Sequence, residues 1–169
     1  MPQVSRHELM LRPQYRLIVV RDIDADAAEG RSRAIEEAAT TVAAATDYEV
    51  VIAAAQELTL VHLEVETWEG PPDTIEDQGW SHPLTFTIDL PTGELLAGDT
   101  FGKVIDNIEV PEGPGRHTVS VYHRGRDEAA AAAVGIAAAL GAADGPAADA
   151  LQLQGSGVER YLLRIWRPA

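Results

Sequence analysis

Cysteine is absent from this chain of 169 residues, and lysine occurs once, at Lys103. A chain without thiols forms no disulfide, no iron–sulfur cluster and no thiolate metal site, and it has no cysteine nucleophile. The fold must therefore be stabilised by packing, and 169 residues suffice for a self-sufficient core. We expect a single domain over residues 1–169.

Long hydrophobic runs are also lacking. The apolar run at residues 17–20 is far shorter than a signal-peptide core or a membrane span, and charged side chains precede it. The stretch 129–145 is mostly alanine without bulky apolar residues, so it would insert poorly in lipid. We expect a cytoplasmic protein with no membrane partner.

Several catalytic signatures are missing too. The sequence has no Gly-x-x-x-x-Gly-Lys phosphate loop, no Gly-x-Gly-x-x-Gly turn, no Gly-x-Ser-x-Gly elbow and no His-Glu-x-x-His zinc motif. Any active site would have to be assembled from residues scattered along the chain. These absences favour a protein that is not an enzyme.

Acidic residues outnumber basic residues by 27 to 13, which gives a net charge of -14 at pH 7. Binding to a nucleic acid backbone gains its free energy from lysines and arginines that displace counterions, so this charge argues against DNA and RNA partners. Complementary fields speed association, so the charge favours a basic protein partner. Plain solubility is the alternative explanation.

Apolar and polar residues alternate in several short segments, which is the period-two pattern of half-buried strands. Clusters of glycine and proline at 91–93 and 111–115 predict turns, and we interpret the second as the turn of a β-hairpin. Together these signals predict a mainly β fold, an antiparallel β-sandwich or a jelly-roll-like domain. The predicted strands cover residues 15–21, 48–52, 58–68, 84–90, 94–97, 103–110, 117–124 and 158–167.

Two alanine-rich segments, 24–47 and 127–157, interrupt this pattern. We interpret both as insertions at the edge of the sandwich that are either helical or disordered. In the first segment, helical spacing predicts a helix over 32–45 with Ser32 as its N-cap. In the second, Asp127 would cap a helix that runs through the alanines, although alanine offers little apolar area to bury.

A candidate metal site lies on the predicted strand 58–68. Alternation places His62, Glu64 and Glu66 on one face, which we expect to be exposed to water, and a histidine with two carboxylates can hold a divalent cation. His123 is the fourth candidate ligand. The alternative is an ordinary solvated strand face, and no cofactor other than a divalent metal is suggested.

Arginine and tryptophan supply the candidate binding residues. Arg124 and Arg126 lie at a strand end, where they form either a clamp for an anion or carboxylate or ordinary ion pairs. Alternation points Trp68 and Trp166 outward, and Trp80 lies in a loop. An outward tryptophan is a common interface anchor, although a loop or a helix can equally cover it.

Three stretches resemble a family of small uncharacterised bacterial β-sandwich proteins from GC-rich genomes. They are the turn at 68–72, the segment 111–128 with its Val-x-Val-Tyr-His-Arg-Gly-Arg-Asp-Glu sequence, and the terminal segment 159–166. The strand order and the opening strand are also similar, more distantly, to competence-type nuclease inhibitors and to toxin-immunity proteins. The resemblance implies a β-sandwich and brings no catalytic residues.

Three functional hypotheses follow. Charge, size and the missing motifs favour a non-enzymatic protein-binding module, an inhibitor or immunity-type protein that uses an acidic surface. The second hypothesis is a metal-dependent enzyme or a small-ligand-binding sandwich that uses His62, Glu64 and Glu66. The third is a self-associating structural domain, and the sequence leaves open a monomer or a homodimer.

Overall fold

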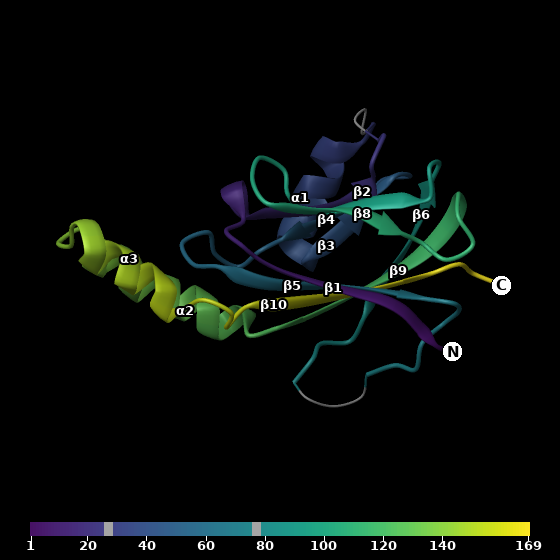
Figure 1. Ribbon diagram of the computed structural model, residues 1–169. Helices are drawn as coiled ribbons and strands as arrows, with labels where there is room; N and C mark the ends of the chain where they lie inside the picture. The colour runs from purple at the N-terminus through teal and green to yellow at the C-terminus, as the bar shows by residue number, and fades with distance from the viewer. Residues whose placement is uncertain (26–28, 76–78) are drawn as a thin grey trace.

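The computed structural model describes residues 1–25, 29–75 and 79–169, and in these residues ten β-strands form two five-stranded sheets that lie face to face (Figure 1). The first sheet has the order β1 (Gln3–Leu11), β5 (Val61–Trp68), β10 (Arg160–Trp166), β9 (Gly115–Arg124), β6 (Leu84–Leu90). The second has the order β3 (Ala43–Ala45), β4 (Glu49–Ala53), β2 (Leu17–Asp22), β7 (Glu94–Asp99), β8 (Val104–Glu109). The predicted mainly β sandwich is confirmed.

The core lies between the two sheets and follows from the alternation of the strands. Each inward side chain is removed from water, and burial of one such side chain contributes about 1.5–3 kcal/mol. The inward residues of β5 and β10 are all fully buried: Val61, Leu63, Val65, Tyr161, Leu163 and Ile165. These two strands run parallel, and the other strand pairs are antiparallel.

The chain crosses between the sheets at its two predicted turns. The turn at 91–93 leads from β6 in the first sheet to β7 in the second, and the turn at 111–115 leads from β8 back to β9. The predicted hairpin of β8 with β9 is therefore wrong, because β8 pairs with β7, and β9 pairs with β6 and β10. A turn signal marks a reversal of the chain but does not say which sheet the next strand joins.

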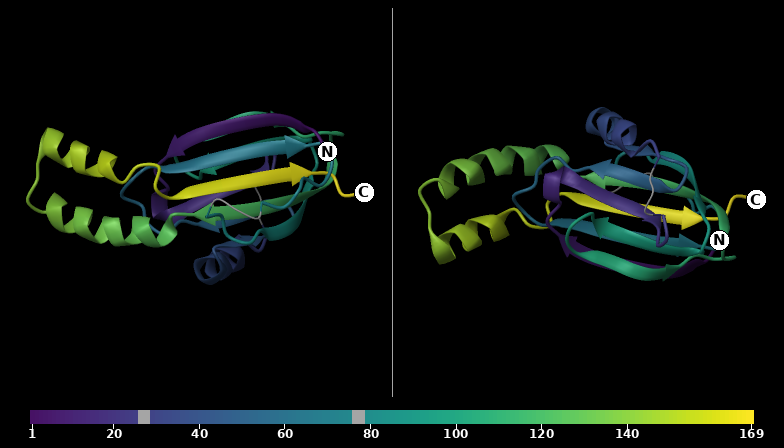
Figure 2. Two further views of the ribbon diagram at one scale, coloured as in Figure 1. Left: turned by 90° about the horizontal axis from the view of Figure 1, so that it is seen from below. Right: turned by 90° about the horizontal axis from the view of Figure 1, so that it is seen from above.

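The first alanine-rich segment forms a helix and the edge strand β3 of the second sheet, consistent with a helical insertion in the sandwich. Helix α1 (Arg31–Thr41) covers the outer face of the second sheet, where Ala34 and Ala38 pack against Val51 (Figure 2). The helix begins after Gly30 instead of Ser32, and the last predicted helical residues form strand β3. Residues 26–28 of this segment lie outside the described residues.

The second alanine-rich segment forms α2 (Arg126–Leu140) and α3 (Gly145–Gln154), a helical hairpin that we call the arm, residues 126–154. The arm projects from one end of the sandwich in every view, and its helices contact mainly each other (Figures 1 and 2). Gly125, in the left-handed conformation, is the N-cap of α2 instead of Asp127. In the described part of the chain, no helix has the length and apolarity needed to cross a membrane.

Strand β1, like the short strand β3, was not predicted from the sequence patterns. Its burial pattern alternates, but its outward residues include Arg6 and Glu8, and few of its inward residues are bulky and apolar. The strand is followed by the short 3-10 helix η1 (Gln14–Arg16), which turns the chain into β2. The first predicted strand, 15–21, therefore begins two residues too early.

Candidate functional site

The outer face of the first sheet collects most of the predicted site residues. The register of the parallel strands β5 and β10 places His62 opposite Arg160, Glu66 opposite Arg164, and Trp68 opposite Trp166. Alternation therefore assigned these side chains to a common face correctly. The strand pairing adds what the sequence did not reveal, namely that arginines contact the candidate ligands.

The two glutamates of this face are paired with arginines and buried. Arg6 lies 2.7 Å from a carboxylate oxygen of Glu64, and Arg160 lies 3.1 Å from the other oxygen. Arg164 donates to Glu66 over 3.0 Å. Glu64 and Glu66 are 5% and 4% exposed, so the expectation of a water-exposed face is wrong for them. Their carboxylates serve a cross-strand charge network in which each negative charge already has a cation.

Of the four predicted metal ligands, only His62 and Glu64 are in direct contact in the described residues, with His62 Nδ1 3.2 Å from a Glu64 oxygen. His62 accepts hydrogen bonds from the Arg160 guanidinium on Nδ1, over 2.6 and 3.0 Å. His123 pairs in register with the inward residue Tyr161, so it lies on the opposite face of the sheet from His62. Within residues 1–25, 29–75 and 79–169, no group of three or more His, Cys, Asp or Glu side chains is arranged to hold a metal ion.

The Trp68 side chain on this face is held by neighbouring charges. Trp68 donates its indole N–H to Glu66 over 3.1 Å, and the Arg164 guanidinium lies over the Trp68 ring at 5.2 Å. Arg164 also donates to the backbone oxygen of Asp73, which ties the following loop to the sheet. Trp68 and Trp166 are half-buried. Trp68 thus contributes to the charge network in addition to any role as an interface anchor.

Trp80, Arg124 and His123 line a hollow of about 480 Å³ where β9 meets the arm. The Arg124 guanidinium lies over the Trp80 ring at 4.5 Å, a cation–π contact. Burial lowers the pKa of His123, and the nearby charge of Arg126 lowers the pKa further, while Asp127 opposes these effects. His123 is therefore held in its neutral form against the inner end of this hollow.

Arg126 also lines this hollow, but its guanidinium is committed to a buried network. It donates to the backbone oxygen of Ala53 over 2.6 Å and to the Tyr161 hydroxyl, and it lies 3.5 Å from Glu159. Glu159 is fully buried and accepts further hydrogen bonds from the Ala55 N–H and from Tyr161. The network fixes the base of the arm to the sandwich. Arg124 and Arg126 line the same hollow, and their action as a clamp for an anion stays a prediction.

An exposed aromatic pair, which the sequence reading missed, lies at the same end of the sandwich as the arm. The rings of Tyr15 and Phe101 meet edge to face with centroids 5.9 Å apart, although the residues are 74% and 68% exposed. Tyr15 and Arg16 both have left-handed backbone conformations, at φ 55° and 60°. Such a conformation costs a residue other than glycine about 1–2 kcal/mol, and strain of this kind is concentrated at functional sites.

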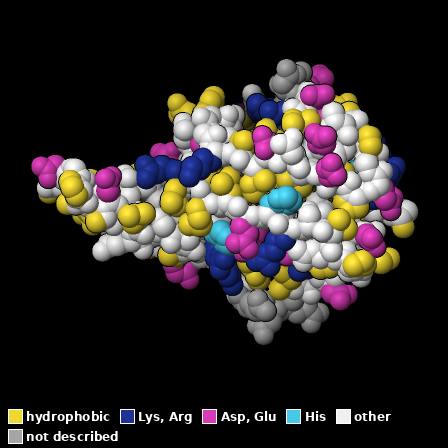
Figure 3. Space-filling model, viewed as in Figure 1, with side chains coloured by type: hydrophobic (Ala, Val, Ile, Leu, Met, Phe, Trp, Pro, Cys, Tyr) yellow, Lys and Arg dark blue, Asp and Glu magenta, His cyan; other side chains and the backbone are white. Residues whose placement is uncertain are grey.

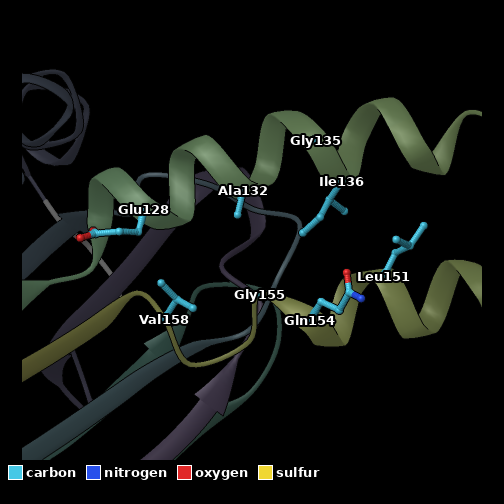
Figure 4. Close-up of a pocket in the computed structure, with 8 residues that line it drawn as sticks. All are labelled: Glu128, Ala132, Gly135, Ile136, Leu151, Gln154, Gly155 and Val158. Carbon is cyan, nitrogen blue, oxygen red and sulfur yellow. The ribbon is translucent and has the colours of Figure 1, made fainter.

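The arm carries a groove of about 500 Å³ between its two helices. Ile136 and Leu151 point into the gap between the helices, and the lining is mostly apolar (Figure 4). Two bulky apolar residues of the arm remain outside any core, Val134 at 74% and Leu153 at 64% exposure. The arm therefore exposes apolar surface that the fold itself does not use.

All charged side chains of residues 127–158 are acidic, and this segment has no lysine, arginine or histidine. Its four carboxylates are exposed, at Asp127, Glu128, Asp144 and Asp149, and they make no ion pair within the described residues. Acidic side chains stand at the far end of the arm and are also spread over the sandwich (Figure 3). Beyond Arg126 at its base, the arm thus combines an apolar groove with charges of one sign.

No family model matches the chain, and a search of curated protein sequences finds no match. Among solved structures, the chain is similar to ComJ from Bacillus subtilis, an inhibitor of the DNA degrading activity of NucA, with a TM-score of 0.55 and 12% identity. The alignment covers 98% of this chain and 96% of ComJ. The chain shares this fold.

A second solved structure supports the same assignment of the fold. It is described as Crocagin biosynthetic gene J, and it matches with a TM-score of 0.56 and 16% identity over 98% of both chains. The expected distant similarity to a nuclease inhibitor is therefore confirmed at the level of the fold. At 12% and 16% identity these matches show that the architecture is shared, and they identify no functional residue of this chain.

Proposed function

We propose that the chain is a non-enzymatic protein-binding module of the inhibitor type, whose acidic surface binds a basic protein. The observation that carries this proposal is the arm: a projecting helical hairpin with an apolar groove, in which every charged group beyond Arg126 at its base is a carboxylate. ComJ, which has the same fold, is an inhibitor, and this supports the choice of an inhibitor.

The arm adds little to the core of the sandwich. Ala129 and Ile136 are the buried residues of α2, and α3 has none. An element that stabilised the fold would bury a bulky apolar stripe against the sheets, as the inward faces of β5 and β10 do. The arm instead leaves Val134 and Leu153 exposed beside its mostly apolar groove, and exposed apolar surface of this kind marks protein-interaction sites.

The negative charge of the arm favours a basic protein as the partner. The four exposed carboxylates attract a basic surface and speed its approach, an effect that salt screens over about 8 Å at physiological ionic strength. Two copies of the arm carry the same charge and repel each other, so the charge disfavours arm-to-arm self-association. The occupant that we propose for the groove is a segment of a basic protein with an apolar face flanked by lysine or arginine.

The test uses the full chain as bait in its own cell extract at low and at high salt. The variant Asp144→Asn/Asp149→Asn removes two charges from the arm, and Asp106→Asn/Glu109→Gln removes two from β8 as a matched control. The captured protein is identified by mass spectrometry, purified, and titrated against all three baits. We expect a basic protein that high salt releases and that binds the arm variant at least about fivefold more weakly than the control.

Two results would overturn the proposal. One is a purified partner that binds the arm variant and the control variant equally tightly. The other is an extract from which the bait recovers only further copies of itself, with a dimer seen by light scattering. That second result would instead favour the self-associating structural domain.

A further inference from the structure

We infer that the end of the sandwich that carries the arm also has a second docking surface. This surface is formed by Tyr15 and Phe101, and it binds an acidic segment of a protein. This surface is separate from the arm groove and takes a ligand of the opposite charge, so it goes beyond the function proposed above. Its starting point is the exposure of both rings, 74% and 68%, in direct contact with each other. Aromatic side chains in such a position are typical interface anchors.

The backbone holds the two rings in place before any ligand arrives. The Arg16 N–H donates to the Pro13 oxygen over 3.1 Å, and the Arg16 oxygen accepts from the Ala54 N–H over 2.7 Å. On the other loop, the Phe101 N–H donates to the Asp99 carboxylate over 3.2 Å. A ligand that binds a fixed surface avoids the entropy cost of ordering it, so pre-organisation increases affinity.

The exposed cations of the loops that carry the rings favour an anionic ligand, whereas the Asp99 carboxylate next to Phe101 is only 3% exposed. Six of the 13 lysines and arginines are exposed, at Arg6, Arg12, Arg16, Arg33, Lys103 and Arg116, and all 13 lie in the described residues. Three of these six, Arg12, Arg16 and Lys103, lie in the loops that carry the rings. None of the three forms an ion pair within the described residues, and Arg12 donates only to the neutral side chain of Gln152.

The same charges favour an acidic protein segment over a nucleic acid. Nucleic acid binding depends on many cations that displace counterions along a continuous backbone, whereas this surface offers three in a chain of net charge -14. A short acidic segment needs few ion pairs, and an apolar or aromatic side chain between its carboxylates would rest against the two rings. The ligand that the surface fits is therefore an acidic peptide segment with at least one apolar side chain.

The test titrates the purified full chain by calorimetry with a copolymer of glutamate and tyrosine, and in parallel with oligo(dT). The variant Tyr15→Ser/Phe101→Ser removes the rings, and Tyr48→Ser, at a tyrosine 41% exposed and outside these loops, is the matched control. We expect the copolymer to bind the wild type and the control alike, and to bind the ring variant at least about tenfold more weakly. Binding should also weaken with salt.

A second variant, Arg16→Ser/Lys103→Ser, keeps the test decisive if the ring variant loses stability, and it should also weaken binding of the copolymer. The inference is overturned if the copolymer does not bind the wild type, or if it binds the ring and charge variants as tightly as the control. Tighter binding of oligo(dT) than of the copolymer would overturn it as well. Neither variant changes a residue that lines the arm groove, so these results can be distinguished from those of the test of the proposed function.

Discussion

The buried carboxylate of Glu159 provides the sharpest test of how the arm is fixed to the sandwich. Its oxygens accept from the Ala55 N–H over 2.6 Å, from the Gln56 amide over 3.2 Å and from the Tyr161 hydroxyl, with Arg126 3.5 Å away. Burial raises the pKa of Tyr161, and the Glu159 charge raises it further, so the hydroxyl keeps its proton and remains a donor. Every oxygen of this carboxylate is thus occupied by donors.

Glu159→Gln removes the negative charge and replaces one acceptor oxygen with an N–H₂ group that faces donors. Removing one partner of a buried ion pair costs about 3–5 kcal/mol, and Arg126, whose side chain is 20% exposed, regains some solvation, so we expect about 3 kcal/mol. Tyr161→Phe removes one hydrogen-bonding group and should cost about 1–2 kcal/mol. Urea unfolding measures both free energies. The proposed role of the Glu159 carboxylate would be refuted if Glu159→Gln lowered the free energy of unfolding by less than about 1 kcal/mol. It would also be refuted if Tyr161→Phe lowered this free energy more than Glu159→Gln does.

Three further predictions concern stability. Gly125→Ala should lower the free energy of unfolding by more than about 2 kcal/mol, because φ is +70° and a Cβ would lie 2.0 Å from the Val158 oxygen; an unchanged urea midpoint would contradict this. Since burial lowers the pKa of His123, its neutral form stabilises the fold above about pH 6.5, and this stability is lost as the pH falls. His123→Asn should therefore flatten the dependence of unfolding free energy on pH between about 5 and 6.5, and equal slopes would exclude this role. Arg31→Ala leaves the Glu49 carboxylate, 1% exposed, without its bidentate partner, so thermal denaturation should show a loss of about 3 kcal/mol, and a loss within error would count against the pair.

Alternation predicted which residues share a face, but the chemistry of that face depends on strand pairing. His62, Glu64 and Glu66 do lie on one side of β5, as the period-two pattern requires. Arg6 and Arg160 reach the same face from β1 and β10, which are far from β5 in the sequence. A pattern within one strand cannot reveal these neighbours, and they turn a candidate metal site into a charge network.

The sequence patterns do not reveal the aromatic pair, because the alternation of apolar and polar residues does not predict whether a side chain outside a strand is exposed. Tyr15 was assigned to the start of a strand, whereas the structure places it in η1, where its left-handed backbone turns the side chain outward. Phe101 lies in a loop, and its contact with Tyr15 joins two connections remote in sequence. Two exposed aromatic residues of this kind become recognisable only when the loops are placed at one end of the sandwich.

The alanine-rich segments show how similar compositions can serve different purposes. In α1, small side chains let the helix approach the second sheet closely, so Ala34 and Ala38 are buried. In the arm, alanine favours the helix through its propensity but buries almost nothing. Composition predicts helices in both segments. Only the positions of the bulky residues Ile136 and Leu151 indicate the groove between the two helices of the arm.

Hydrogen–deuterium exchange of the free chain and of its complex with the captured basic protein tests the central claim most directly. If the basic partner occupies the groove of the arm, amides of residues 126–154 will exchange more slowly in the complex than in the free chain. The same protection should disappear at high salt, because the carboxylates of the arm then attract the partner less. Protection confined to the sandwich, with unchanged exchange in α2 and α3, would contradict the claim.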